Sequence, residues 1–391
     1  MKKTIVGIDK IGFYVPQQYL AMEDLSDARH VALEKFTVGI GQDKMAVPEI
    51  YEDIVTMGAN AAEQILSDQD KQDIDQIIFA TESSFDLSKS AASYIHDLLE
   101  IQPFARSFEM KQACYSATAA LQMAKDYVLL HPEAKVLVIS SDISRYGLDS
   151  SGEVTQGAGA LAFLVKAQPT ILAIDDTNLA MTKSHYDFWR PIYMDKALVK
   201  GQYSTGIFLE FYQALLAEFQ QRYPGVVEQS KAFLFHMPFT KIAQKALKLA
   251  QGMVSLDRVQ EWTSHLETAT LINRQVGNIY TGSLYMSLLS LLINDEKLDA
   301  GDKIAMFSYG SGAVAELFIL EIQANFDMQV DSNLIIKMLE NRKALSIADY
   351  ERIYQTRLPQ DGSDFLGKPE ANYHGFYIKD IHNHQRTYGY Q

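Results

Sequence analysis

The chain has 391 residues, 47% of them hydrophobic, so it is long enough for two domains or one large two-lobed unit with a substantial core. Its formal net charge of -14 argues against general nucleic-acid binding, and its single cysteine excludes both an intrachain disulfide framework and a cysteine-based metal cluster. Since it also lacks a long apolar run, we expect a cytoplasmic protein with no metal, no nucleic-acid partner and no membrane partner.

Short apolar strands alternate with helical stretches along the chain, and four strand candidates occur twice in the same order. The first copy comprises residues 4–9, 76–81, 134–141 and 160–165, and the second comprises residues 170–175, 232–235, 302–308 and 313–320. This order predicts an internal duplication with halves at residues 1–168 and 169–391. It therefore predicts a layered α/β fold with two sheets packed around central helices.

A further strand candidate, residues 104–110, leads to Cys114 at the start of a helix of small residues. A thiol at a helix N-terminus lies near the positive end of the helix dipole, which favours the thiolate and therefore a nucleophile. A buried structural cysteine is the alternative, and Cys114 alone does not separate the two.

In each half, one polar residue follows the second strand and another begins the central helix. Glu82 and Cys114 hold these positions in the first half, and His236 and Asn278 hold them in the second. A pseudo-twofold axis between the halves would bring all four into one pocket. Singly, a glutamate after a strand is more often solvated, and a histidine beside apolar residues is more often part of a core. Their symmetric placement favours a shared site.

The C-terminal end of the second half, residues 349–391, is rich in tyrosine. It carries Tyr350, Tyr354, Tyr373, Tyr377, Tyr388 and Tyr390. Because this stretch is too aromatic for a simple disordered tail, we expect it to pack on the body of the protein.

Several motifs together resemble those of one enzyme family. They are Gln-Ala-Cys-Tyr-Ser-Ala around Cys114, Ala-Thr-Glu-Ser-Ser around Glu82, Phe-His-Met-Pro-Phe around His236, Gly-Asn at residues 277–278 and Tyr-Gly-Ser-Gly-Ala at residues 309–313. Over nearly its whole length the chain is similar to bacterial-type 3-hydroxy-3-methylglutaryl-CoA (HMG-CoA) synthases of the thiolase superfamily. The resemblance implies a thiolase-like fold, in which two duplicated α/β halves form an αβαβα layered sandwich.

The same resemblance implies an acyltransferase of the mevalonate pathway to isoprenoids, with no cofactor beyond its CoA thioester substrates. Cys114 would take the acetyl group of acetyl-CoA, and Glu82 would remove a proton from the acetyl methyl group. His236 would protonate the ketone oxygen of acetoacetyl-CoA, and Asn278 would help hold the acetoacetyl group. Backbone N–H groups at Cys114 and in the loop 310–312 would stabilise negative charge, and water would release HMG-CoA.

Lys241, Lys245 and Lys248 follow the His236 strand at helical spacing, so a helix would place them on one face. In an acidic chain this stripe would suit the phosphates of CoA, whereas the plainer interpretation is a solvated basic face. The resemblance points to Lys241 and Lys245 as CoA-binding residues. It also assigns substrate contacts to Ala32, Leu33, Tyr146, Thr155, Ser204 and Ser311.

Three alternative functions stay open. A β-ketoacyl carrier-protein synthase would use Cys114, His236 and Asn278 but leave Glu82 without a role. A related synthase acting on carrier-protein-bound acyl groups would keep all four residues. A non-catalytic thiolase-fold scaffold is disfavoured because every catalytic position holds a competent residue. By analogy with enzymes of this fold we expect a homodimer that binds acetyl-CoA and acetoacetyl-CoA.

Overall fold

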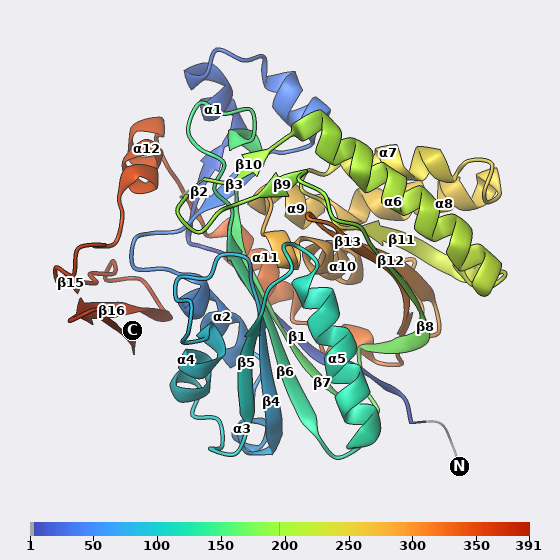
Figure 1. Cartoon of the computed structure of the whole chain (residues 1–391), viewed down its shortest axis with the longest axis horizontal. Helices are drawn as coiled ribbons and strands as arrows, with labels where there is room; N and C mark the ends of the chain where they lie inside the picture. The colour runs from blue at the N-terminus through green and yellow to red at the C-terminus, as the bar shows by residue number, and fades with distance from the viewer. Residues whose placement is uncertain (1–3, 195) are drawn as a thin grey trace.

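The computed structural model describes residues 4–194 and 196–391. Within these residues, nine strands form a mixed sheet in the order β11-β12-β13-β8-β1-β7-β6-β4-β5 (Figure 1). The strands of this sheet are β1 (Val6–Tyr14), β4 (Ile74–Ala80), β5 (Arg106–Met110), β6 (Lys135–Ile143), β7 (Ala158–Ala167), β8 (Leu172–Thr182), β11 (Ser230–Phe235), β12 (Lys303–Gly310) and β13 (Val314–Ile322).

The sheet repeats one pattern on either side of its centre. Read outward, one side runs β1-β7-β6-β4 and the other runs β8-β13-β12-β11. On each side the first two pairings are antiparallel and the third is parallel. The four strand pairs predicted from the sequence are these eight strands, so the internal duplication is confirmed. Strand β5 extends the first side alone.

The two sides meet along a short seam between β1 and β8, which pair antiparallel at Gly7 with Ala173 and Ile8 with Leu172. A Cβ atom at Gly7 would lie 2.0 Å from the carbonyl oxygen of Leu172, so glycine permits this close approach. The two predicted sheets are therefore joined by hydrogen bonds into one. The boundary proposed near residue 168 falls between β7 and β8 and stays a prediction.

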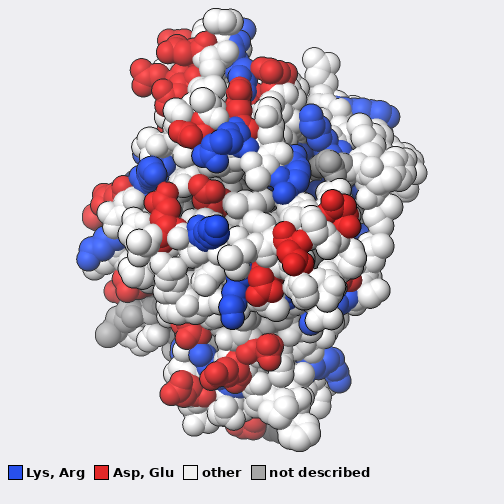
Figure 2. All heavy atoms as spheres, turned by 90° about the vertical axis from the view of Figure 1, so that its left-hand side faces the viewer, with Lys and Arg blue, Asp and Glu red and all other residues white. Residues whose placement is uncertain are grey.

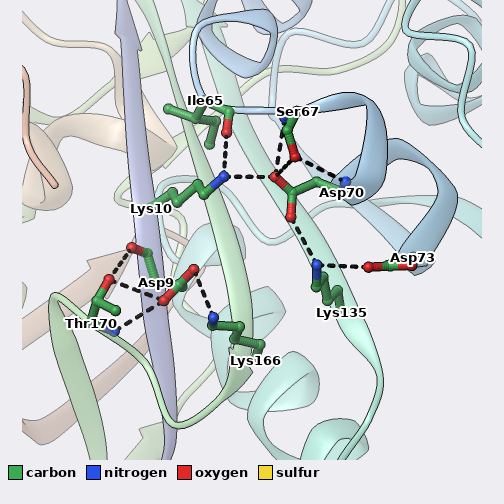
Figure 3. Close-up of polar contacts among 9 residues, drawn as sticks. All are labelled: Asp9, Lys10, Ile65, Ser67, Asp70, Asp73, Lys135, Lys166 and Thr170. Carbon is green, nitrogen blue, oxygen red and sulfur yellow. Dashed lines mark hydrogen bonds and ion pairs between the residues drawn. The ribbon is translucent and has the colours of Figure 1, made fainter.

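Side chains flanking the seam strengthen it (Figure 3). Asp9 accepts hydrogen bonds from the backbone N–H of Thr170 at 3.1 Å and from its hydroxyl at 3.0 Å, and it forms an ion pair with Lys166 at 3.2 Å. Near by, Asp70 forms ion pairs with Lys10 at 2.6 Å and Lys135 at 2.9 Å. These contacts tie a short helix to β1 and β6, and they serve a structural role.

Helices cover both faces of the sheet and fill the space between its two sides (Figure 1). The helices α2 (Ile54–Glu63) and α4 (Ala91–Leu98) pack on one outer face, and α6 (Gly201–Arg222), α7 (Lys241–Ala250) and α8 (Leu256–Ala269) pack on the other. The helices α5 (Ser116–Leu130) and α10 (Ser283–Asn294) share a core with both sides. Because α10 is buried on almost every side, it is largely apolar, as a middle layer requires, and its buried Ser287 and Ser290 donate to the carbonyls of Ala269 and Thr268. The αβαβα sandwich is confirmed.

Smaller elements surround this sandwich. The remaining helices are α1 (Met22–Ala28), α3 (Asp68–Asp73), α9 (Leu271–Val276), α11 (Ser332–Glu340) and α12 (Ile347–Gln355), with a π-helix at Lys35–Ile40 and short 3₁₀ turns at Glu153–Thr155, Val227–Gln229, Tyr280–Gly282 and Phe326–Met328. The remaining strands are β2 (Gln18–Ala21), β3 (Lys44–Val47), β9 (Phe188–Trp189), β10 (Leu198–Val199), β14 (Lys343–Ala344), β15 (Phe365–Leu366), β16 (Phe376–His382) and β17 (Gln385–Tyr390).

The tyrosine-rich C-terminal segment packs on the body of the protein, as predicted, and the structure places its β16–β17 hairpin against the first half. Tyr350 and Tyr373 are buried, whereas Tyr390 is 66% exposed. The hydroxyl of Tyr388 and the guanidinium of Arg386 both donate to the carboxylate of Asp53, at 2.9 and 2.6 Å. Asp53 also caps the N-terminus of α2, so the β16–β17 hairpin is fastened to that helix.

Acidic and basic side chains are interspersed on the face that carries the C-terminal segment (Figure 2). Among the described residues, no helix is both long and apolar enough to cross a membrane.

Candidate active site

Cys114 lies half-buried in the loop between β5 and α5. Ala113 before it has a φ of 44°, and Ser116 Oγ accepts a hydrogen bond from the Gln112 N–H while donating to the Ala113 carbonyl at 3.0 Å. At Gly310 a Cβ atom would lie 2.7 Å from the carbonyl oxygen of Gln112, so glycine lets the end of β12 approach this loop. The backbone around the thiol is therefore fixed from both halves.

The structure brings Cys114 and Glu82 together. The thiol donates a hydrogen bond from Sγ to Glu82 Oε1 at 3.4 Å. Burial in the protein, and to a smaller extent the charge of Asp142, raises the pKa of Glu82 to about 8. Enclosure and the facing carboxylates also raise the pKa of the Cys114 thiol well above its usual value. The expectation that the helix would favour the thiolate is therefore wrong for this state, because enclosure, and after it the carboxylates of Glu82 and Asp142, oppose the effect of the dipole.

Asp142 of β6 is a buried residue that sequence reasoning did not assign to the site. Its Oδ1 accepts hydrogen bonds from the hydroxyls of Thr81 and Ser83, both at 2.8 Å, and from the backbone N–H of Glu82 at 2.9 Å. Its Oδ2 accepts from Thr281 Oγ1 at 2.5 Å. Asp142 thus holds Glu82 and ties the first half to the start of α10. A charged residue inside an apolar strand was the signal for it.

A second group of predicted residues surrounds Asn278. Its Nδ2 donates to Tyr146 Oη at 2.8 Å, and its Oδ1 accepts from the Tyr280 N–H at 2.9 Å and from Ser283 Oγ at 2.7 Å. The backbone N–H of Asn278 donates to the carbonyl of Thr155 at 3.0 Å. The structure therefore brings Tyr146, Thr155 and Asn278 together, with the amide orientation fixed by three bonds.

This group of residues lies beside the pair of Cys114 and Glu82. The charges of Cys114 and Glu82 contribute to the raised pKa of Tyr146, although burial is the larger cause. The ring of Tyr146 also packs edge-on against Phe188 and Tyr280, each with centroids 6.0 Å away. Aromatic side chains thus surround Tyr146 on the side of Phe188 and Tyr280.

His236 follows β11 directly, and Glu82 is the second residue after β4. It is buried, and burial lowers its pKa to about 3, so the imidazole is neutral at pH 7. Among the described residues, its Nδ1 has no hydrogen-bond partner and no hydrogen bond joins it to Cys114, Glu82 or Asn278. The convergence of His236 with the other three residues therefore stays a prediction.

A buried carboxylate, Asp187, organises the far side of the site and was also missed. It accepts hydrogen bonds from Tyr309 Oη at 2.7 Å, from the Gly312 N–H at 2.9 Å and from Ser204 Oγ at 3.3 Å. Ser204 and the loop 310–312, which carries Ser311, are thus linked through Asp187. The Gly312 N–H serves Asp187 in this arrangement, so it does not serve as the expected oxyanion donor.

The predicted CoA-binding residues lie apart from this network. Ala32 is exposed and Leu33 half-buried in the turn after α1. Lys241 begins α7, where its Nζ donates to Gln244 at 3.1 Å, and Lys245 is exposed with its ammonium over the ring of Phe239. The opposite face of α7 is buried, so these lysines lie on the open face, as their spacing predicted. Their contact with CoA stays a prediction.

Comparison with known proteins gives matches along the chain. The N-terminal family model of hydroxymethylglutaryl-coenzyme A synthase matches residues 2–169, and the C-terminal model matches residues 248–391. The chain is 47% identical to hydroxymethylglutaryl-CoA synthase of Enterococcus faecalis, over 98% of this chain and 99% of that protein. It is 32% identical to the polyketide biosynthesis 3-hydroxy-3-methylglutaryl-ACP synthase PksG of Bacillus subtilis, over 89% of this chain and 88% of that protein.

A solved structure of an HMG-CoA synthase complexed with CoA has 46% sequence identity and a TM-score of 0.95, covering 99% of this chain and 100% of that one. The matches extend over both duplicated halves, and the structural agreement includes the layers that position Glu82 and Cys114. The chain belongs to the hydroxymethylglutaryl-CoA synthase family.

Proposed function

We propose that this protein condenses acetyl-CoA with acetoacetyl-CoA and water to give HMG-CoA and CoA, through an acetyl group carried on Cys114. The observation that carries the proposal is the 3.4 Å contact between Cys114 Sγ and Glu82 Oε1. An acetyl group attached to Sγ places its methyl within a few bonds of that carboxylate. The same contact that holds the thiol therefore aims a base at the carbon that must lose a proton.

In the first step the thiol sulfur attacks the acetyl carbonyl, the bond to the CoA sulfur breaks, and the thiol proton goes to the departing CoA. Glu82 then removes a proton from the acetyl methyl group, and the resulting enolate attacks the ketone of acetoacetyl-CoA. Its raised pKa, about 8, makes Glu82 a stronger base than an ordinary carboxylate. Water finally cleaves the bond to Cys114.

His236 is proposed as the proton donor to the ketone oxygen. The imidazole is neutral at pH 7 and carries one N–H, which can donate to an oxygen that gains negative charge. The unpartnered Nδ1 of this buried ring is consistent with a partner supplied by substrate. Asn278 and Tyr146 would hold the acetoacetyl group beside it.

CoA binding is proposed for Ala32, Leu33, Lys241 and Lys245. Contact with the pantetheine or acyl part is proposed for Thr155 and Ser204, and contact with the acetoacetyl part for Ser311. A family member 46% identical to this chain has been solved in complex with CoA, which supports CoA thioesters as substrates. The open lysine face of α7 supplies positive charge of the kind that pairs with phosphates in an otherwise acidic protein. We propose no cofactor beyond these thioesters, and a cytoplasmic location.

A homodimer is proposed through the edge of the large sheet. Among the described residues, β5 is the outermost strand on its side and pairs only with β4. Phe104 just before it is 92% exposed. A second copy of the chain can continue the sheet at this edge and cover these groups.

A carrier-protein substrate is the second candidate, because a relative 32% identical to this chain is named as a 3-hydroxy-3-methylglutaryl-ACP synthase. The contact between Glu82 and Cys114 suits either donor. Rates with acetyl-CoA and with an acetylated carrier protein, measured side by side, separate the two.

The deciding experiment follows the mass of the intact protein after acetyl-CoA is added and again after acetoacetyl-CoA is added. We expect an acetyl adduct that disappears as HMG-CoA forms. Cys114→Ser should gain no acetyl group, and Glu82→Ala should become acetylated but form no product. A wild-type protein that never becomes acetylated by acetyl-CoA would contradict the proposed function.

A further inference from the structure

Arg190 contacts the proposed base from a segment far away in sequence. It follows β9, in the connection between β8 and α6, and its side chain is exposed. Its Nη2 donates a hydrogen bond to the backbone carbonyl of Glu82 at 2.6 Å. No sequence pattern assigned a role to Arg190.

The segment that carries Arg190 is anchored on the site itself. Asp187 is buried against Tyr309 and the Gly312 N–H, and the ring of Phe188 packs edge-on against Tyr280 at 5.9 Å. The short strands β9 and β10 pair through Phe188 with Val199 and Trp189 with Leu198. The β9–β10 hairpin therefore presents Arg190 to Glu82 from a defined position rather than from a free loop.

The charges that surround Glu82 are unbalanced. Five titratable groups interact electrostatically with its carboxyl. They are Asp142 of β6, Cys114 before α5, Arg190 of the β9–β10 hairpin, Tyr146 after β6 and Tyr280 before α10. Asp142 disfavours the ionised form of Glu82, and Arg190 is the positive charge that favours it. The base needs that ionised form.

We propose that Arg190 is a positioning residue for the condensation step: it holds the main chain at Glu82 and increases the fraction of Glu82 carboxylate that is ionised and ready to accept the methyl proton. The proposal rests on the proposed function, because it concerns the step in which Glu82 acts as a base. It makes the β9–β10 hairpin part of the catalytic arrangement, since the hairpin supplies the charge that the buried strands do not.

The proposal separates the two half-reactions. Acetyl transfer to Cys114 does not require ionised Glu82 as a carbon base, whereas C–C bond formation does. Loss of the positive charge should therefore slow only the second step, and most strongly at low pH. Because Arg190 is exposed, solvent weakens its effect, and we expect a shift of about 0.5–1 pH unit in the ionisation of Glu82.

The test compares Arg190→Gln, which keeps a hydrogen-bond donor without the charge, with Arg190→Lys, which keeps the charge. Acetylated enzyme is mixed with acetoacetyl-CoA, and the rate of HMG-CoA formation in a single turnover is measured from about pH 6 to pH 9. Arg222→Gln is the matched control, because Arg222 lies at the far end of α6 in an exposed ion pair with Glu218.

For Arg190→Gln we expect acetylation at the wild-type rate. The rising limb of the plot of condensation rate against pH should move to higher pH by about 0.5–1 unit, so that the condensation rate at pH 7 falls roughly fivefold. The rate should recover at high pH. Arg190→Lys should move the limb back toward wild type, and Arg222→Gln should leave it in place. In the wild type, added salt should also move the rising limb to higher pH, because salt screens the exposed charge of Arg190.

A limb that stays in place in Arg190→Gln and in high salt would overturn the proposal, as would an equal loss at every pH or a loss confined to acetylation. These results differ from failure of the proposed function itself. In that case the wild-type protein would form no HMG-CoA, and the comparison of variants would have no starting rate.

Discussion

At the scale of single residues, the site is governed by two carboxylates of different function. Asp142 accepts five hydrogen bonds and is buried, so its partners compensate for its burial. Glu82 receives one weak thiol hydrogen bond and keeps a carboxyl that is hard to ionise. Environment alone thus makes one acid an anchor and the other a base.

The raised pKa of Glu82 predicts a dependence of stability on pH. An acid whose pKa rises from 4.5 to about 8 on folding favours the folded state most below pH 4.5, and this contribution is lost as pH rises to about 8. Glu82→Gln should therefore flatten the fall in unfolding free energy across this range, measured by urea unfolding. Glu52, with a pKa raised to about 7 by burial, acts equally in both proteins, so their difference isolates Glu82. Parallel curves for the two proteins would contradict the raised pKa.

Asp142→Asn should destabilise the protein by about 1–3 kcal/mol. The amide N–H₂ group of asparagine is a donor, and it would take the place of a carboxylate oxygen whose partners are themselves donors. Equilibrium unfolding in urea measures the change. The matched control is Asp126→Asn, on the exposed surface of α5, which should leave the midpoint nearly unchanged. Equal midpoints for the two variants would argue against an anchoring role for Asp142.

The sequence was informative about the residues that follow a repeated pattern. Glu82 and Cys114 were found because the duplication pairs them with His236 and Asn278. Asp142 and Asp187 were missed because their partners, such as Thr281 and Tyr309, come from distant segments. The predicted direction of the Cys114 pKa shift was wrong because helix position is local information, whereas the enclosure of the thiol and the carboxylates that face it are products of the fold.

At the scale of elements, the turn before α10 depends on one glycine. Gly277 has a φ of 93°, and a Cβ atom there would lie 1.9 Å from the carbonyl oxygen of Gln156. The next residue is Asn278, whose N–H bonds to Thr155. A side chain at residue 277 would therefore displace the loop that positions the Asn278 amide.

Gly277→Ala should thus lower both stability and HMG-CoA formation. Gly301→Ala is the matched control, because Gly301 has a φ of 91° but nothing within 4 Å of the added Cβ. Gly301→Ala should lower the free energy of unfolding by only about 1 kcal/mol, from backbone strain alone, and should leave activity intact. Gly277→Ala should cost at least about 2 kcal/mol more, measured by thermal unfolding. Equal effects of the two changes would show that the close approach is unimportant.

The β16–β17 hairpin should loosen when its anchor is removed. Arg386 and Asp53 are largely buried, with side chains 15% and 10% exposed, and the guanidinium also lies 3.9 Å from the Phe85 ring centroid. Arg386→Gln should speed amide hydrogen exchange in residues 376–390 while leaving the central sheet protected. Arg352→Gln, which removes an exposed ion pair with Asp349, is the control and should leave exchange unchanged in both regions.

The repeated strands were predictable because their apolar runs and order recur, and the tail was predictable because of its tyrosines. The seam between β1 and β8 was not, since two residue pairs leave no periodic signal. The β9–β10 hairpin was also missed, because each strand has only two residues and its position depends on the burial of Asp187.

At the scale of the whole molecule, the open edge of β5 predicts a dimer. Light scattering coupled to gel filtration should give twice the chain mass of 44.0 kDa. Exchange of the β5 amides should quicken on dilution as the edge becomes exposed, while exchange in β6, inside the sheet, should not. A mass of 44.0 kDa at all concentrations would exclude the dimer.

The solitary thiol also sets how the whole protein responds to oxidants. Peroxide reacts with thiolates, and enclosure beside Glu82 and Asp142 keeps Cys114 protonated in the resting state. The chain has no second cysteine that could capture a sulfenic acid on Cys114 as an intrachain disulfide before irreversible oxidation to the sulfinic acid. Glu82 and Asp142, which set up the condensation step, thus also protect Cys114 from the oxidation that would inactivate it.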